Sequence, residues 1–378
     1  MKLTCTQENL TRAVGIVARS VGKDASLPVL SNVLLATERG RLKLASTNLE
    51  LGVTCFVGAR VEKEGSLTVP ARLLLDYVSN LPSNSVSLEV SGDTLNLECG
   101  ENHASIKGIP ASEFPLIPGT QENPNVVIEG ERLAQAIGQV VFAAAKDESR
   151  PEIAGVYVQI MDDGEVRMAA TDSYRLAERR FKNGVRLTGS PTAAIIPGKA
   201  LSELHRILGS GAGEVSMAFQ DGQVIFSFED PTLTGGNVEV VSRVVEGRYP
   251  DYAQIIPESY LTKVKLNQKE FSTALKATSL FSRADASDLH LAVQEKDQAV
   301  SFSAESGQLG KNDSVIPGEV EGGDQKIVFN HRYLLDGLSA CGTDEISLCL
   351  NSDAAPGALL PTGDASEGYT YIIMPIKS

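Results

Sequence analysis

The sequence predicts an α+β protein made of three repeats of one unit, in which two helices pack on antiparallel strands. Three amphipathic segments of similar pattern begin at Leu3, Val126 and Val264, and Leu10, Leu133 and Phe271 hold the same place in each. Another apolar residue follows four positions later, which is the spacing of a helix that faces a core. Because the starts divide the 378 residues into similar thirds, we expect domains over 1–125, 126–258 and 259–378.

The second helix of each repeat is expected over 69–82, 195–208 and 328–342. Proline stands at a predicted first helical position in the first two of these segments, and Asn330 is the expected N-cap of the third. Turn sequences such as Ser-Gly-Asp at 91–93 and Gln-Asp-Gly at 220–222 join short alternating runs, which predicts antiparallel hairpins. The segment 351–369 is rich in Pro, Gly, Ala and Ser and is expected to be a mobile loop between two strands.

The composition is that of a soluble globular protein, with 42% hydrophobic and 22% charged residues. The sequence has no run of about 18 apolar residues that would span a bilayer, and its first residues lack the apolar core of a signal peptide. Five cysteines form no CxxC pair, which favours a reducing compartment. We therefore expect a cytoplasmic protein.

The residues that usually carry catalysis are scattered. His103, His205, His290 and His331 lie in all three repeats without an HExxH pattern, and no glycine-rich phosphate-binding loop is present. The acidic pair 162–163 lies in a predicted hairpin turn, where Asp-Gly needs no catalytic explanation. The sequence therefore predicts no enzyme, no metal site and no cofactor.

Positive charge is distributed along the predicted helices although the net charge is −14. Stripes of basic or polar residues at spacings of seven and four lie along the first helices of the three repeats: Arg12, Arg19 and Lys23; Arg132, Gln139, Lys146 and Arg150; Lys269, Lys276 and Arg283. Arg72, Lys199 and Arg332 fall in the first turns of the second helices. The start of a helix favours anions, so basic side chains at this place indicate that a phosphate group binds there. With no Trp and 5% aromatic residues, a stacking platform for single strands is disfavoured. We expect duplex DNA to be held by its backbone, facing Arg12, Arg19, Lys23, Arg72, Lys146, Arg150, Lys199, Arg206, Lys276, Arg283 and Arg332.

Five motifs occur in order along the whole chain: LPVLSNVLL at 27–35, LTVPARLLLDYVSNLP at 67–82, ATDSYRLA at 170–177, EGRYPDY at 246–252 and YIIMPIK at 371–377. Together with the three repeats, these motifs make the chain resemble the bacterial DNA polymerase III beta subunit, the replicative sliding clamp. The resemblance implies DNA-clamp domains arranged as a head-to-tail homodimer that closes a ring around duplex DNA. Such a ring would tether the replicative polymerase and give it processivity, without catalysis and without sequence preference.

The resemblance also implies a pocket between the second and third domains that receives short peptides of the polymerase, the clamp loader and other partners. Carried over to this sequence, the pocket comprises Ile153, Thr171, Ser173, Tyr174, Arg175, Leu176, Pro250, Gln254, Ile255, Ile372, Ile373, Met374, Pro375, Ile376 and Lys377. Many members of the family have Gly-His in place of Ser173 and Tyr174 and a basic residue in place of Gln254, so this pocket is expected to be narrower and less cationic. The related stretches 44–51 and 302–310 are expected to have lost the groove.

At the dimer interface, Leu280 and Phe281 occupy the place where the family presents apolar residues to the partner subunit. The alternative to a clamp is a three-repeat adaptor that binds partner peptides but not DNA, with basic stripes that are merely solvated. Ring closure and salt-dependent association with DNA distinguish the two hypotheses.

Overall fold

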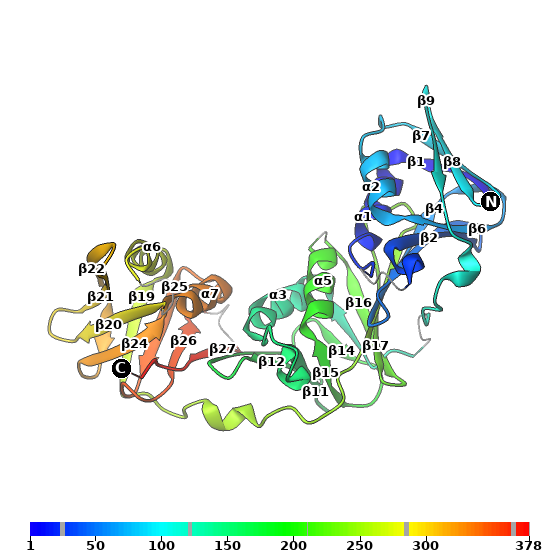
Figure 1. Ribbon diagram of the computed structural model, residues 1–378. Helices are drawn as coiled ribbons and strands as arrows, with labels where there is room; N and C mark the ends of the chain where they lie inside the picture. Colours follow the sequence, from blue (N-terminus) through cyan, green and yellow to red (C-terminus); the bar gives the residue numbers. More distant parts are fainter. Residues whose placement is uncertain (23–26, 120–122, 210, 283–286, 364–367, 378) are drawn as a thin grey trace. The chain divides into compact units, whose positions relative to one another are not determined.

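The computed structural model describes residues 1–22, 27–119, 123–209, 211–282, 287–363 and 368–377 (Figure 1). Lys23 and Arg283, expected to face DNA, lie outside these residues. The chain packs as two compact units. The first contains Met1–Ala134, Gly184–Thr192 and Lys199–Val244, and the second contains Gln135–Asn183, Ala193–Gly198 and Val245–Ser378.

The first unit contains a five-stranded and a nine-stranded sheet, whose orders are β5-β1-β7-β8-β9 and β14-β10-β16-β17-β18-β4-β3-β2-β6. Its strands are β1 (Lys2–Thr6), β2 (Asn32–Glu38), β3 (Arg41–Thr47), β4 (Leu51–Gly58), β5 (Arg60–Lys63), β6 (Ser66–Pro70), β7 (Ser85–Ser91), β8 (Thr94–Cys99), β9 (Asn102–Lys107), β10 (Val126–Glu129), β14 (Val185–Leu187), β16 (Glu214–Gln220), β17 (Gln223–Glu229) and β18 (Asn237–Arg243). Its helices are α1 (Gln7–Val17), α2 (Ala71–Ser79) and most of α5 (Gly198–Leu208), with short 3₁₀ turns η1 (Pro28–Ser31) and η2 (Ala111–Glu113).

The second unit contains a nine-stranded and a four-stranded sheet, whose orders are β15-β11-β12-β13-β27-β26-β25-β19-β23 and β22-β21-β20-β24. Its strands are β11 (Gly155–Ile160), β12 (Val166–Thr171), β13 (Arg175–Phe181), β15 (Thr192–Pro197), β19 (Thr262–Asn267), β20 (Asp288–Gln294), β21 (Ala299–Ser306), β22 (Gly310–Pro317), β23 (Glu319–Glu321), β24 (Gln325–Asn330), β25 (Glu345–Leu350), β26 (Gly357–Pro361) and β27 (Tyr369–Ile373). Its helices are α4 (Pro151–Ala154), α6 (Gln268–Ser279) and α7 (His331–Cys341), with η3 (Val141–Ala143) and η4 (Tyr252–Ile255); α3 (Gly130–Val140) begins in the first unit and ends in the second.

Both nine-stranded sheets continue from one repeat into the next. In the first unit β18 of the central repeat pairs with β4 of the first, from Asn237 opposite Phe56 to Ser242 opposite Leu51. In the second unit β13 of the central repeat pairs with β27 of the third, from Arg175 opposite Ile373 to Arg179 opposite Tyr369. The α+β class and the antiparallel sheets predicted from the sequence are confirmed, but the central repeat shares its hydrogen bonds with both neighbours.

The helices form where amphipathic patterns follow a capping residue. Thr6 caps α1 by accepting from the Asn9 amide, and Asn330 caps α7 by accepting from the Arg332 amide, as predicted for Asn330. Helix α1 packs against α2 and β4, and α6 lies beside α7 (Figure 1). In the third repeat the stacked rings of Phe271 and Phe302, 5.3 Å apart, join α6 to β21.

Three local expectations were wrong. Pro70 and Pro197 end strands just before their helices and do not take the first helical position. Helix α1 ends at Val17 and α3 at Val140, so the stripes that we placed on single helices run past the helix ends. Gln139 faces inward and is 5% exposed, because its amide donates to the Ala340 carbonyl of α7 (3.0 Å).

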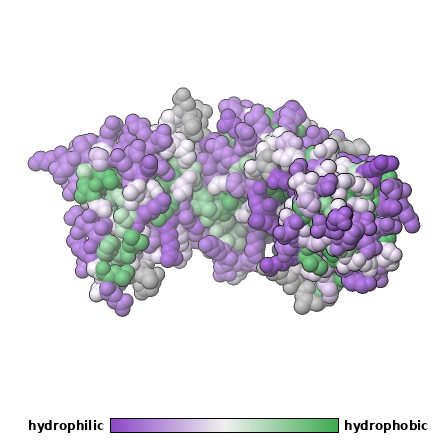
Figure 2. Space-filling view, turned by 90° about the horizontal axis from the view of Figure 1, so that it is seen from above, coloured by the Kyte–Doolittle hydropathy of each residue, from purple (hydrophilic) through white to green (hydrophobic). Residues whose placement is uncertain are grey.

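The expected loop at 351–369 also contains a strand. Segment Gly357–Pro361 forms β26, which pairs with both β25 and β27. Glycine is required at position 357 by packing, because the Cβ of any other residue would lie 2.6 Å from the Phe329 ring. No helix of the described residues is long and apolar enough to cross a membrane. On the face seen in Figure 2 hydrophilic residues predominate and hydrophobic ones form separate patches.

Candidate functional site

The candidate pocket is built on the tight loop that joins β12 to β13. The Thr171 hydroxyl donates to the Arg175 carbonyl oxygen (2.7 Å) and accepts from the Ser173 amide (3.1 Å). The Asp172 carboxylate accepts from the amides of Tyr174 and Arg175, each at 3.0 Å. Asp172 therefore holds the turn by an Asx-type arrangement, and Ser173 and Tyr174 are exposed at its tip.

Ser173 adopts the left-handed backbone region, with a φ of 77°. An L side chain there costs about 1–2 kcal/mol, whereas glycine adopts the region freely. We expect Ser173→Gly to raise the free energy of unfolding by about 0.5–1 kcal/mol, less than the full strain because glycine also loosens the unfolded chain. Urea denaturation measures the change. Ser259→Gly, at an exposed serine without positive φ, is the control and should not stabilise; equal behaviour of both variants would contradict the strain argument.

Arg175 is the most constrained member of the predicted pocket. Its side chain is 5% exposed, and its guanidinium donates to Asp172 (2.9 Å), to Asp336 of α7 (2.6 Å) and to the Phe142 carbonyl of η3 (2.8 Å). The guanidinium carbon also lies 4.5 Å from the centre of the Tyr333 ring. Arg175 thus ties the central repeat to α7 of the third repeat.

The charge of Arg175 is retained in spite of burial. Burial lowers the pKa of a cation, but Tyr371, Asp336 and Asp172 together raise the pKa of Arg175 above its ordinary value. Removing this side chain would leave Asp336 and Asp172 without their shared cation. The residue therefore has a structural role as well as the predicted place at a peptide pocket.

The C-terminal strand lies beside the strand that follows this loop. Strand β27 pairs with β13, and beyond it the Met374 amide donates to the Tyr174 carbonyl (2.8 Å). Two residues later the Ile376 amide donates to the Val328 carbonyl of β24 (2.8 Å). The segment Met374–Lys377 therefore crosses from the pocket loop to the four-stranded sheet.

A tyrosine cluster packs against two of the predicted pocket residues. The rings of Tyr157 and Tyr249 stack at 5.4 Å, and Tyr252 meets Tyr249 edge-on at 6.2 Å. They belong to one apolar cluster with the predicted pocket residues Leu176 and Ile372. The Tyr252 hydroxyl donates to Glu178 (2.7 Å), and burial raises its pKa well above the ordinary value, so the phenol stays neutral.

The predicted pocket residues divide into a buried and an exposed set. Ile153, Thr171, Arg175, Leu176, Ile372 and Ile373 are buried. Tyr174 is 63% exposed, and Ile255 and Met374 also present apolar surface to solvent. Ser173, Gln254 and Lys377 are exposed polar residues, while Pro250, Pro375 and Ile376 are half-buried. The Gln254 amide donates to Asp251 (2.7 Å).

Sequence reasoning missed the residues that support the pocket from other elements. Phe142, Tyr333 and Asp336 hold Arg175, but no local pattern marks them because the contacts join distant segments. Arg150 was expected to face DNA; its guanidinium donates to the Ser173 hydroxyl (3.3 Å) and lies 3.6 Å from Glu152. Arg150 is therefore also a neighbour of the pocket loop.

The first repeat contains the same loop. Thr47 donates to the Leu51 carbonyl (2.9 Å), Asn48 accepts from the amides of Glu50 and Leu51, and Leu49 has a φ of 75°. Within the first unit a cavity of about 230 Å³ adjoins this loop. The first and central repeats thus share the loop, and side chains such as Arg175 distinguish the central copy.

The described basic residues that were expected to face DNA differ in their contacts and in their exposure. Arg12 lies 3.2 Å from the buried Asp230 carboxylate, and Arg206 contacts Glu203 and donates to the Ile16 carbonyl (3.2 Å). Arg72 is 96% exposed and 3.8 Å from Asp76. The other residues that were expected to face DNA are all exposed: Arg19, Lys146, Lys199, Lys276 and Arg332. Leu280, expected at the dimer interface, is 72% exposed, and Phe281 is half-buried.

Among the described residues, no group of three or more His, Cys, Asp or Glu side chains could hold a metal ion. The five cysteines are buried and unbonded to one another. Burial raises the pKa of Cys5 to about 12, so this thiol is neutral at physiological pH.

Comparison with known proteins gives the class, a three-domain DNA clamp. Family models of the DNA polymerase III beta subunit match residues 1–118 (N-terminal domain), 127–251 (central domain) and 253–377 (C-terminal domain). The beta sliding clamp of Synechococcus elongatus is 33% identical over 100% of this chain and 99% of its own length, and that of Staphylococcus aureus is 28% identical over 100% of both. The chain belongs to the DNA polymerase III beta subunit family.

Solved structures agree with the sequence comparison. The DNA polymerase III beta subunit of Thermotoga maritima has a TM-score of 0.90 at 26% identity and covers 100% of this chain with 99% of its own. The sliding clamp of Pseudomonas aeruginosa, solved bound to griselimycin, has a TM-score of 0.90 at 26% identity with 100% of both chains covered.

Proposed function

We propose that two copies of this chain close a head-to-tail ring around duplex DNA and tether the replicative polymerase, the clamp loader and other partners to it. The ring itself catalyses nothing and needs no cofactor. Its place of action is the cytoplasm, on chromosomal DNA. Domains over 1–125, 126–258 and 259–378 supply six similar parts to the ring.

The observation that carries the proposal is the construction of the sheets. At each junction between repeats, a five-stranded half-sheet meets a four-stranded half-sheet, through β18 and β4 in one case and β27 and β13 in the other. The chain also contains one five-stranded and one four-stranded sheet that are not joined to another half-sheet. The five-stranded sheet ends in β9, which is equivalent to β18 and β27, and the four-stranded sheet ends in β22, which is equivalent to β4 and β13. A second copy whose β22 pairs with β9 would repeat the same junction, and two such pairings close a ring instead of a filament.

The surroundings of β22 support this seam. The Thr278 hydroxyl near the end of α6 donates to Asn312 (2.9 Å) and contacts Ser314 (3.2 Å), which fixes the helix end against β22. Leu280 directly follows the last residue of α6 and is 72% exposed, while Val315 on β22 is 65% exposed. Within the described residues β22 is an edge strand, paired with β21 on one side. Exposed aliphatic side chains beside such an edge suit a subunit contact, in which Leu280 and Phe281 would meet the first repeat of the partner.

The DNA contact is loose in this proposal. Exposed cations such as Arg72, Lys276 and Arg332 would touch phosphates, whereas Arg12 and Arg206 are engaged within the protein and would contribute less. An overall charge of −14 opposes tight binding to a polyanion. Retention would therefore depend on topology, with the peptide pocket around Tyr174 and Met374 holding the partners.

Retention on DNA tests the proposed function. The protein is loaded with a clamp loader onto a nicked circular plasmid, and the bound fraction is followed at high salt before and after the plasmid is cut. We expect the protein to stay on the circle and to leave the linear form. Equal loss from both as salt rises would indicate ordinary counterion release and would favour a peptide-binding adaptor without a ring.

A further inference from the structure

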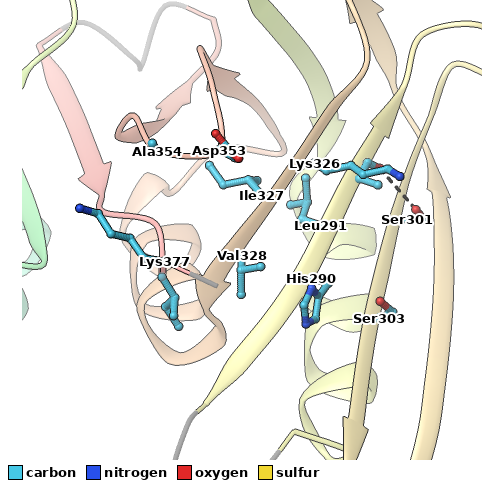
Figure 3. A pocket seen from close by; sticks show the side chains of 12 residues that line it. His290, Leu291, Ser301, Ser303, Lys326, Ile327, Val328, Asp353, Ala354 and Lys377 are labelled. Carbon is cyan, nitrogen blue, oxygen red and sulfur yellow. Dashed lines mark hydrogen bonds between the residues drawn. The ribbon is translucent and has the colours of Figure 1, made fainter.

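The third repeat carries a second hollow beside the pocket, on the outer face of the four-stranded sheet. It has a volume of about 600 Å³ and is lined by β20, β21 and β24, by Asp353 and Ala354, and by Ile376 and Lys377 of the C-terminal segment (Figure 3). We call it the outer groove. All of its residues belong to the second unit.

Small side chains make the groove. Across the three strands, Val328, His290 and Ser303 stand opposite one another in one row, and Lys326, Ala292 and Ser301 in the next. The alternating partners Leu289, Leu291 and Phe329 point into the core. Alanine and serine at the centre of a solvent-facing sheet leave room above the backbone that long polar side chains would otherwise fill.

The groove is continuous with the peptide pocket through the C-terminal segment. Met374 is hydrogen-bonded to the pocket loop at Tyr174, and Ile376 to Val328 in the groove. Ile376 and Lys377 belong to both the predicted pocket and the lining of the groove. A chain leaving the pocket along this segment would reach the groove within a few residues, since an extended chain spans about 3.3 Å per residue.

The charged residues of the groove are mostly basic. Lys326 and Lys377 are exposed, and within the described part of the chain neither forms an ion pair. His290 stands between Val328 and Ser303, and Asp353 is the one carboxylate of the lining. Two lysines at a groove of an otherwise acidic protein favour an anionic occupant.

We propose that the outer groove binds an acidic stretch of the partner protein that flanks the peptide seated in the pocket. The inference rests on the proposed function of the pocket and extends it. Lys326 and Lys377 would attract Asp or Glu side chains, while the shallow floor at Ala292, Ser301 and Ser303 would accept the extended backbone. Partners with acidic flanks would then bind more tightly than partners that share only the apolar anchors.

Fluorescence polarisation with labelled synthetic peptides tests the inference. The core probe is a hexapeptide with leucine and phenylalanine anchors, and separate probes add four glutamates or four serines at either end. We expect the glutamate extension at one end to lower Kd about three- to tenfold relative to serine at low salt, with the gain shrinking as ionic strength rises. Lys326→Glu should abolish this gain and leave the Kd of the core hexapeptide unchanged. Ser303→Tyr, which fills the groove without changing charge, should also reduce it.

Lys296→Glu is the matched control, because Lys296 is exposed in the β20–β21 turn of the same repeat and does not line the groove. An equal loss in both charge-reversal variants would attribute the gain to the general field of the protein and overturn the inference. Equal Kd values for glutamate and serine extensions in the wild type would also overturn it, with the pocket intact. If the core hexapeptide failed to bind, the proposed pocket itself would fail. Weakened retention on circular DNA by Lys326→Glu with unchanged peptide binding would reassign the lysine to DNA.

Discussion

Replacement of Arg175 by alanine is expected to lower the free energy of unfolding by about 2–3 kcal/mol. The substitution removes a cation that is 5% exposed, and Asp172, Asp336 and the Phe142 carbonyl lose the hydrogen bonds that the guanidinium donates. The cost is below that of a fully buried pair because Asp336 is 49% exposed and can be hydrated. Urea denaturation followed by circular dichroism measures the change.

Arg175→Lys should recover only part of this loss, because one ammonium cannot reach all three acceptors with the geometry of a guanidinium. Lys182→Ala is the control: Lys182 and Asp163 form an exposed pair, 60% and 63% accessible, whose loss should change the stability far less than the loss of Arg175. Arg175→Ala should also weaken binding of pocket peptides while the dimer persists. A variant as stable as the wild type would show that the second unit does not depend on this tie, and loss of the dimer would contradict the separation of pocket and seam.

Leu280→Asp should weaken the dimer by at least roughly 100-fold in dissociation constant. Burial of one leucine contributes about 1.5–3 kcal/mol, and a two-membered head-to-tail ring contains the contact twice. Because Leu280 is 72% exposed in the single chain, the fold of the monomer should be unaffected. Sedimentation equilibrium measures dimerisation, and the plasmid retention assay should show parallel loss from circular DNA.

Leu261→Asp is a close control, since Leu261 is also 72% exposed in the third repeat but lies away from α6 and β22. The proposed interface predicts a normal dimer for this variant. Equal dissociation constants for Leu280→Asp and the wild type would remove α6 and β22 from the contact, and equal weakening by both substitutions would point to an unspecific effect of added charge.

The sequence was sufficient for the repeats, the antiparallel hairpins and the two main helices of each repeat, because these depend on local patterns. The sequence was insufficient where contacts between distant segments determine the end of a helix or the direction of a side chain. Helix α1 ends at Val17, whose carbonyl accepts from the Ser46 hydroxyl of β3, and Gln139 turns inward to meet Ala340. Neither partner is visible from the neighbouring sequence. Strand β26 was missed because Gly357 and Pro361 read as loop residues, whereas pairing on both sides stabilises the strand.

The candidate site shows the same division. The resemblance carried by ATDSYRLA and YIIMPIK predicted residues that the structure brings together in one unit, around the β13–β27 pair. Arg175 connects the central repeat to the third through Asp336 of α7, and the positive φ of Ser173 results from the turn that Thr171 and Asp172 form. The residue identities alone predicted neither feature. The same turn at Leu49 shows that backbone geometry alone does not identify a pocket.

The shared sheets have a consequence for how the chain can be divided. A fragment cut at the repeat boundaries, such as 126–258, would lose the neighbours of both β18 and β13. Each strand would then expose a row of unsatisfied amides and carbonyls that can recruit strands of other molecules. Although the repeats look like separable modules in the sequence, the isolated central one should therefore aggregate during expression, and the smallest well-behaved piece of this protein is larger than one repeat.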